Sequence, residues 1–144
     1  MIGIVVTGHA HFPSGLLSAV ELVAGKPEDV VGIDFESGQS SDDLRAALRT
    51  AVESLEGEEV LILADLVGGT PFNTAVLLKE QIPEKKIRVL AGINMAGMVE
   101  AVFSRNILPF EALAEQVKTA AADGVISLDD LSADSGEAEF EDGL

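Results

Sequence analysis

The chain has 144 residues, enough for one domain with a sizeable core, and it contains no cysteine, which excludes disulfides and thiol chemistry. Its 25 acidic and 9 basic residues give a formal charge of −16, which repels nucleic acid phosphates and anionic membrane surfaces. Six phenylalanines with no tryptophan or tyrosine leave few platforms for stacking bases or sugar rings, so nucleic acid binding and lectin functions are disfavoured.

The first residues run from Met1 directly into a β-branched stretch without a basic leader. No apolar run approaches the roughly 18 residues that a membrane span requires. We therefore expect a cytoplasmic protein that does not insert into a membrane.

Apolar, β-branched runs alternate with segments of helical period along the chain. In chain order, the expected elements are strand 2–6, helix 13–23, strand 30–35, helix 41–55, strand 60–64, helix 70–82, strand 87–91, helices 95–105 and 109–121, and a short apolar run at 124–128. This alternation predicts an α/β fold: a doubly wound, mostly parallel four-stranded sheet with helices on both faces. The strands are nearly continuous apolar runs, as expected when helices cover both faces of the sheet.

Two helix beginnings carry capping signals. Ser40 or Ser41 precedes two aspartates, a side-chain oxygen cap followed by acids in the first turn. Thr70 precedes Pro71, which predicts a threonine cap with proline at the first helical position.

The C-terminal residues differ in composition from the rest of the chain. No basic residue occurs after Lys118, and residues 132–144 contain five acids and two glycines. We expect one folded domain over residues 1–130 and an acidic, disordered tail over residues 131–144. The alternative is that this tail is a linker to a further domain.

A histidine and an aspartate follow two of the predicted strands. His9 follows the first strand after Gly8, and Asp65 follows the third strand directly. If both strands are parallel, these side chains meet in the crevice at the carboxyl ends of the sheet, where open α/β sheets bind ligands. A neutral imidazole oriented by a carboxylate can act as a nucleophile or base. The plainer interpretations are a polar turn residue for His9 and a helix cap or surface turn for Asp65.

His11 forms a His-x-His pair with His9, which can bind a metal when a third ligand such as Asp65 is available. We expect instead that no metal binds and that His11 is a partly exposed loop residue whose replacement has little effect.

Gly68, Gly69 and Thr70 lie between Asp65 and a predicted helix. Flexible backbone before a helix beginning can present N–H groups and the positive end of the helix dipole to an anion. Beside a nucleophile, this segment predicts a phosphoryl-binding cradle; alone, it would be only a turn. Signatures for ATP, dinucleotides and α/β-hydrolase serines are absent from the sequence, and no cofactor is expected.

Three motifs resemble those of one bacterial family, the IIA components of the phosphoenolpyruvate-dependent sugar phosphotransferase system (PTS), mannose family, which includes mannose, fructose, sorbose and N-acetylgalactosamine types. The motifs are Ile-Val-Val-Thr-Gly-His at 4–9, Leu-Ala-Asp-Leu-Val-Gly-Gly-Thr-Pro-Phe-Asn at 63–73, and Ala-Gly-Ile-Asn-Met-Ala-Gly-Met-Val-Glu at 91–100. The second is the most specific, and the resemblance spans about residues 1–130.

The resemblance implies a transferase that acts as a phosphoryl carrier. His9 would accept a phosphoryl group from the histidine phosphocarrier protein HPr and pass it to a IIB component, with a membrane IIC/IID complex served indirectly. Asp65 would orient His9; we expect it to hold the distal ring nitrogen. The resemblance also implies a homodimer in which a strand at 124–128 is exchanged and pairs antiparallel in the sheet of the other subunit.

Phe12, Met95 and Met98 are the expected apolar contacts for HPr, with core packing as the alternative for the two methionines. Three other functions stay open from the sequence: a phosphocarrier subunit of dihydroxyacetone kinase, a non-catalytic regulatory dimer of the same fold, and a metal-dependent hydrolase.

Overall fold

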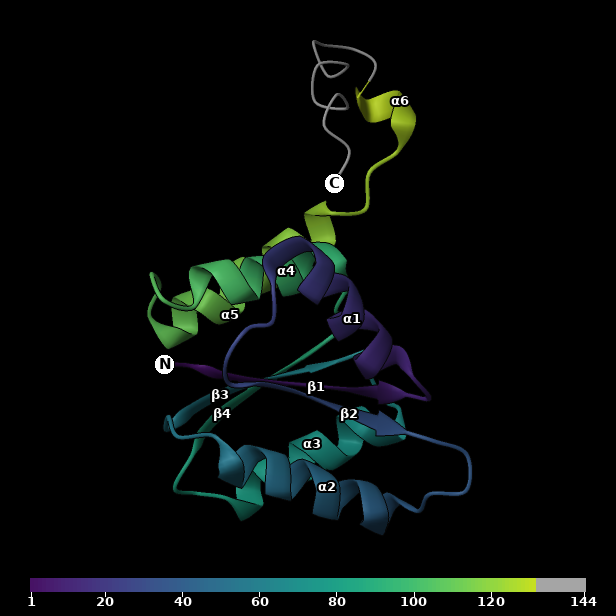
Figure 1. The fold of residues 1–144 in the computed structure, drawn as a ribbon, viewed down its shortest axis with the longest axis vertical. Coiled ribbons are helices and arrows are strands. Elements are labelled where there is room, and N and C mark those ends of the chain that lie inside the picture. The colour runs from purple at the N-terminus through teal and green to yellow at the C-terminus, as the bar shows by residue number, and fades with distance from the viewer. Residues whose placement is uncertain (132–144) are drawn as a thin grey trace.

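The computed structural model describes residues 1–131. Four strands form one parallel sheet in the order β2-β1-β3-β4: β1 (Gly3–His9), β2 (Val30–Phe35), β3 (Glu59–Ala64) and β4 (Lys86–Ala91). The helices are α1 (Phe12–Ala24), α2 (Ser41–Ser54), α3 (Thr70–Gln81), α4 (Met95–Ser104), α5 (Phe110–Asp123) and α6 (Leu128–Leu131). The predicted α/β fold is thus confirmed, with a sheet that is parallel throughout (Figure 1).

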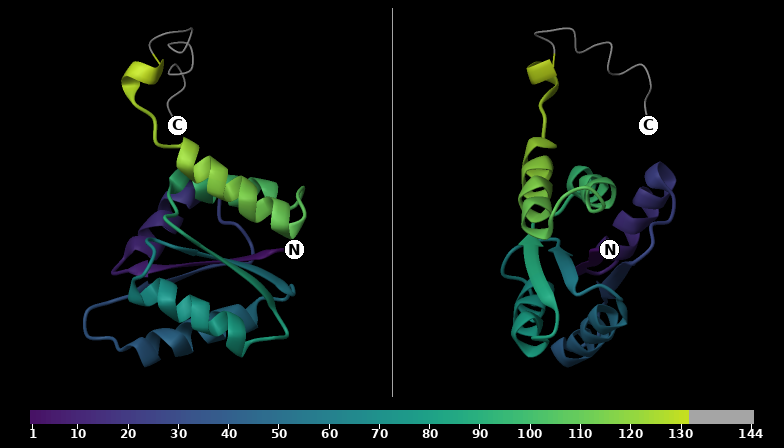
Figure 2. Two further views of the ribbon diagram at one scale, coloured as in Figure 1. Left: turned by 180° about the vertical axis from the view of Figure 1, so that it is seen from behind. Right: turned by 90° about the vertical axis from the view of Figure 1, so that its left-hand side faces the viewer.

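The helices form a layer on each face of the sheet. In Figures 1 and 2, α1, α4 and α5 cover one face, and α2 and α3 cover the other. Alternate residues of β1 serve the two layers: Ile4 and Val6 pack with the first group, and Val5 packs with the second. All three side chains are fully buried, as expected for a central strand between two helical layers.

The strand order creates a topological switch point between β1 and β3. The chain leaves β1 for β2 on one side and later returns to β3 on the other side, so the connections diverge at the carboxyl ends of β1 and β3. In doubly wound sheets, ligands bind in the crevice at such a point. Thr7 pairs with Ala64 at this end, which brings the residues that follow them, including Asp65, to the same crevice.

One of the two predicted helix caps is confirmed, and the other is wrong. Ser40 is the N-cap of α2 and forms a complete capping box with Asp43, as predicted. The predicted threonine cap is wrong, because Gly69 is the N-cap of α3 and Thr70 is its first helical residue. The Thr70 hydroxyl is therefore not used as a cap and forms no hydrogen bond within residues 1–131.

The described part of the C-terminal region, residues 124–131, contains no strand. Gly124 ends α5, residues 125–127 are irregular, and Leu128 begins α6. A strand needs a neighbouring strand to satisfy its backbone groups, and within residues 1–131 of one copy no strand pairs with this segment. The disordered tail was predicted over residues 131–144. Leu131 is the last residue of α6, and the remaining residues, 132–144, lie outside the described residues. Every helix within residues 1–131 is too short or too polar to span a bilayer.

Candidate functional site

His9 and Asp65 are hydrogen-bonded to one another at the carboxyl ends of β1 and β3. Asp65 Oδ2 lies 2.8 Å from His9 Nδ1 and also accepts the His9 backbone N–H at 2.9 Å. The backbone N–H of Leu66 donates to the other carboxylate oxygen at 2.9 Å. The His9 side chain is 47% exposed, whereas that of Asp65 is 10% exposed. The prediction that these two side chains meet is confirmed. The strand β1 continues further than predicted, so His9 is its last residue.

The hydrogen bonds of Asp65 keep its carboxylate ionised. Burial raises the pKa of Asp65, but the backbone and ring hydrogen bonds from His9 and the Leu66 N–H outweigh this effect, so the pKa lies below its ordinary value. An ionised carboxylate only accepts hydrogen bonds, and Nδ1 of His9 must therefore carry the proton. The lone pair of the neutral ring is then on Nε2, the ring nitrogen that Asp65 does not bind.

The expectation that Asp65 holds the distal ring nitrogen is wrong. The carboxylate binds the proximal nitrogen, Nδ1. The reason is that the same oxygen also accepts the His9 backbone N–H, and only the proximal nitrogen lies within reach of a group that close to the main chain.

Close packing around the ring requires glycine at two positions. A Cβ on Gly69 would lie 2.7 Å from His9 Cε1 and 3.3 Å from Nε2, so the beginning of α3 lies against the free end of the imidazole. A Cβ on Gly8 would lie 2.9 Å from the Cγ of Asp65. The distances of 2.7 Å and 2.9 Å are shorter than real Cβ contacts. The absence of a side chain at both glycines therefore leaves room for the His9–Asp65 pair.

The segment between Asp65 and α3 is shaped by Gly68 and Asn73. Gly68 has a φ of +84°, a left-handed conformation that favours glycine. The Asn73 side chain donates to the Gly68 carbonyl at 3.1 Å and so ties this turn to α3. Of the three residues predicted to form the cradle, Gly69 lies against the His9 ring, and Gly68 and Thr70 flank it in the sequence. The role of Asn73 was missed, although its amide three residues after the beginning of the helix could have suggested it.

The aromatic ring of Phe35 lies beside His9 on the β2 side. The ring centroids of His9 and Phe35 lie 6.4 Å apart at an interplanar angle of 64°, an edge-on contact. Phe35 is the last residue of β2 and pairs in register with His9. Sequence reasoning missed this residue, because only the strand register shows that β2 ends beside His9.

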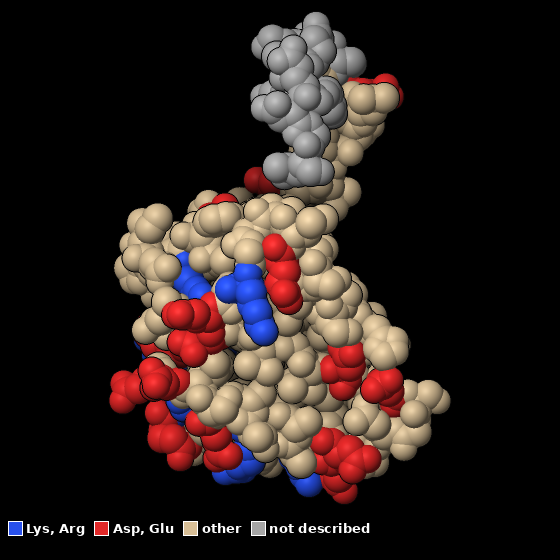
Figure 3. Space-filling view, in the orientation of Figure 1, with Lys and Arg blue, Asp and Glu red and all other residues tan. Residues whose placement is uncertain are grey.

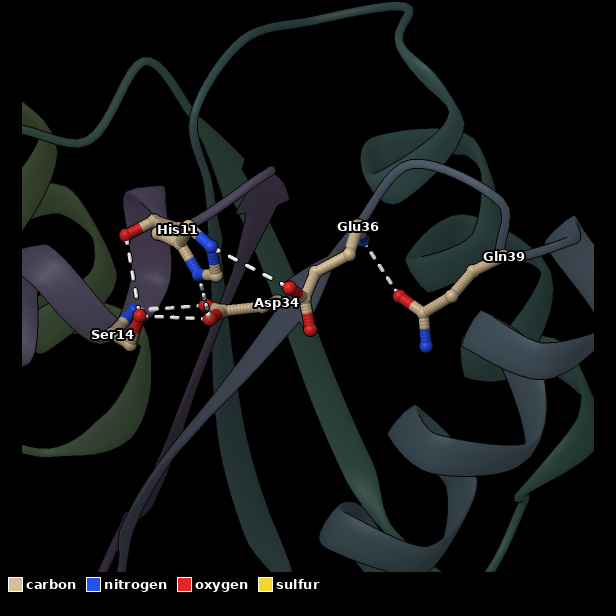
Figure 4. Close-up of polar contacts among 5 residues, drawn as sticks. All are labelled: His11, Ser14, Asp34, Glu36 and Gln39. Atoms are coloured by element: carbon tan, nitrogen blue, oxygen red, sulfur yellow. Dashed lines mark hydrogen bonds and ion pairs between the residues drawn. The ribbon is translucent and has the colours of Figure 1, made fainter.

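His11 takes part in a separate network with Asp34, Ser14 and Glu36 (Figure 4). Its Nδ1 lies 3.1 Å from Asp34 Oδ2, and its Nε2 lies 3.4 Å from Glu36 Oε1. The hydrogen bond with Asp34 and the charge of Glu36 raise the pKa of His11. His11 is exposed, as predicted, but it has specific partners. The two histidines of the His-x-His pair turn to different acids, and residues 1–131 contain no group of three side chains suited to a metal ion.

The predicted partner contacts are largely core residues. Met98 is 0% exposed, so it cannot contact a partner, and core packing is the correct interpretation. Phe12 and Met95 are partly buried against the same core. Leu66 and Val67, which sequence reasoning did not single out, are 50% and 70% exposed directly beside Asp65. Two apolar residues between a candidate catalytic acid and a glycine turn were the available signal.

Among the charged side chains on the face shown in Figure 3, acidic ones predominate, in keeping with the formal charge of −16.

Comparison with known proteins agrees with this geometry. Residues 3–118 match the family described as PTS system fructose IIA component. The chain is 27% identical over 119 residues to the fructose-specific EIIA component of Bacillus subtilis, covering 82% of this chain and 80% of that protein. It is 30% identical over 129 residues to the mannose-specific EIIAB component of Escherichia coli (strain K12), covering 88% of this chain but only 39% of that longer protein.

A solved structure is also similar. The EIIA phosphotransferase component from Streptococcus agalactiae superposes with a TM-score of 0.85 and 42% identity, covering 90% of this chain and 99% of that one. The family match extends over most of the chain and includes both partners of the His9–Asp65 pair. The chain therefore belongs to the mannose family of PTS IIA components.

Proposed function

We propose that this chain is a phosphoryl carrier in which Nε2 of His9 accepts a phosphoryl group from phosphorylated HPr and passes it to a IIB component. The family supports a role in phosphotransfer within a sugar PTS. The observation that carries the proposal is the orientation of the ring. Asp65 binds Nδ1, and the free Nε2 lies against the beginning of α3.

The transfer runs in line between two histidine nitrogens. The lone pair of His9 Nε2 forms the new N–P bond, and the electron pair of the breaking bond returns to the ring nitrogen of the donor. His9 gains positive charge in this step, and the Asp65 carboxylate stabilises that charge through the Nδ1–H hydrogen bond. Passing the phosphoryl group on reverses these changes.

Two helices begin near His9, but only one is open to an anion. The Ser14 N–H in the first turn of α1 already donates to the Asp34 carboxylate at 2.9 Å. At α3, the first backbone hydrogen bond of the helix is from Asn73 to Gly69, and no acid lies in the first turn. The earlier N–H groups and the Thr70 hydroxyl are therefore available for the phosphoryl oxygens.

HPr and the IIB component must reach the same exposed nitrogen, so their docking surface surrounds His9. Leu66 and Val67 supply exposed apolar area beside the site. Apolar residues at the centre of an interface exclude water, and water would otherwise hydrolyse the phosphoramidate. The membrane IIC/IID complex is then served through the IIB component.

The same proposal includes a homodimer with exchanged C-terminal strands. β4 is an edge strand, and a groove of about 530 Å³ lies beside it, lined mostly by apolar residues of β4 and α5. Val125 and Ile126 follow α5 and are strongly exposed in the single chain. An antiparallel strand from a second copy, placed along β4, would cover this groove and satisfy the edge.

The phosphoryl acceptor can be identified by intact mass. After incubation with phosphoenolpyruvate, enzyme I and HPr, the native chain should gain one acid-labile phosphoryl group. His9→Ala should gain none because it lacks the nucleophile, while His11→Ala should gain the group as the native chain does. A native chain that remains unmodified would favour the non-catalytic regulatory dimer, and a modified His9→Ala variant would move the acceptor elsewhere.

Gly69→Ala tests the cradle at α3. The added Cβ would overlap the His9 ring, so the ring or the helix must shift, and the rate of phosphoryl transfer from HPr should fall by about 10- to 100-fold. Gly15→Ala is the matched control, since a Cβ there meets nothing within 4 Å and should leave the rate unchanged. Equal rates for the native chain and Gly69→Ala would contradict the proposed placement.

Sedimentation velocity tests the exchanged strand. The native chain should sediment as a dimer, and Ile126→Lys should shift it toward monomer, because it places a charge on the segment that would cover the groove. Leu22→Lys, which replaces an exposed apolar residue on α1, should remain dimeric. A monomeric native chain would rule out the exchange.

A further inference from the structure

The carboxyl end of β2 is hydrogen-bonded to the segment that follows His9. Ala10 donates its backbone N–H to the Phe35 carbonyl at 2.7 Å, and the Phe35 N–H donates back to Ala10 at 3.3 Å. Ala10 has a φ of +50°, an uncommon conformation for a residue with a side chain. The chain therefore turns sharply between His9 and α1, and bonds to β2 maintain that turn.

The Asp34 side chain adds a second set of bonds just beyond this turn (Figure 4). Its carboxylate accepts the Ser14 N–H at 2.9 Å and the Ser14 hydroxyl at 2.7 Å, and it lies 3.1 Å from His11 Nδ1. His11 is the N-cap residue of α1 but provides no capping hydrogen bond of its own. Asp34, from a different element, caps the helix in its place.

The cap can influence the position of His9, because the connection between His9 and α1 is very short. Only Ala10 and His11 separate His9 from α1. Asp34 pairs in register with Gly8, so β2 holds this segment from the side opposite to Asp65 on β3. A shift of the first turn of α1 would be transmitted directly to the backbone that carries the imidazole.

We propose that Asp34 is a positioning residue for phosphoryl transfer at His9: its carboxylate locks the beginning of α1 and thereby directs Nε2 of His9 toward α3. This inference rests on the proposed carrier function. Asp65 sets the tautomer and Asp34 sets the place of the segment, so the two acids act on the same residue from the two strands that flank β1.

The His11–Asp34 pair is similar to the His9–Asp65 pair, but its surroundings do not suit a second phosphoryl acceptor. Nε2 of His11 faces the Glu36 carboxylate, which would repel a phosphoryl group. The first turn of α1 is occupied by Asp34, so the N–H of Ser14 cannot receive the phosphoryl oxygens. The pair therefore acts as a structural lock beside the reacting histidine.

Asp34→Asn is the direct test, with Asp42→Asn as its matched control, because Asp42 is exposed on α2 and pairs only with Arg45 among the described residues. The rate of phosphoryl transfer to the chain is measured against the concentration of phosphorylated HPr. Asp34→Asn should lower the maximal rate by about tenfold without changing the half-saturating HPr concentration, since the nucleophile is misplaced while the docking surface is intact. Asp42→Asn should behave as the native chain does.

A purely stabilising role would not produce this split, because measurements well below the unfolding temperature report on folded molecules. A native maximal rate for Asp34→Asn would overturn the proposal, as would a phosphoryl group found on His11. If Asp34→Asn does not fold, Ser14→Ala, which removes one donor and keeps the carboxylate, should still lower the maximal rate by about threefold. An unchanged rate for that variant would equally overturn it.

The His9 ring gives a readout that does not depend on transfer. Nitrogen-15 NMR of the imidazole should show a changed Nδ1–H signal or tautomer population in Asp34→Asn but not in Asp42→Asn. If the native chain takes up no phosphoryl group, the carrier function fails, and the ring spectra alone then decide whether Asp34 positions His9. Identical ring spectra would refute the positioning role.

Discussion

The site depends on one carboxylate that binds a histidine twice. Asp65 accepts both the backbone N–H and the ring Nδ1–H of His9, so it fixes the position of the residue and the tautomer of the ring together. These bonds require β1 and β3 to end at the same level, which the parallel register provides. They also require Gly8 and Gly69, because a Cβ at either position would overlap the pair. The sheet topology and two glycines therefore serve one hydrogen-bonded pair.

The surroundings of the ring are asymmetric, and in the proposed reaction that asymmetry determines on which side of His9 the phosphoryl group would lie. The beginning of α1 is capped by Asp34, whereas the beginning of α3 retains free N–H groups and the Thr70 hydroxyl. A negative phosphoryl group is repelled from the first and attracted to the second. The protein carries a formal charge of −16, so under the proposed carrier function the local arrangement of dipoles, rather than net charge, would attract the phosphoryl group to Nε2.

Much of the site could be predicted from the sequence, because His9 and Asp65 directly end or follow apolar runs and the α/β alternation places such residues at one edge. The choice of ring nitrogen could not, since it depends on the reach of Asp65 to the main chain of His9. Met98 was misassigned because methionine on an apolar helix looks the same in sequence whether it faces solvent or the core. Asp34 and Phe35 were missed because their relevance arises only from the register of β2 with β1.

The proposal that Nε2 of His9 accepts the phosphoryl group is tested most directly by locating that group on the ring. Nitrogen-15 and phosphorus-31 NMR of the phosphorylated chain, prepared with phosphoenolpyruvate, enzyme I and HPr, distinguishes the two ring nitrogens of His9. Phosphorylation is expected at Nε2, with a proton retained on Nδ1 and donated to Asp65. A phosphoryl group on Nδ1 would contradict it, because that nitrogen could react only if the hydrogen bond to Asp65 were broken.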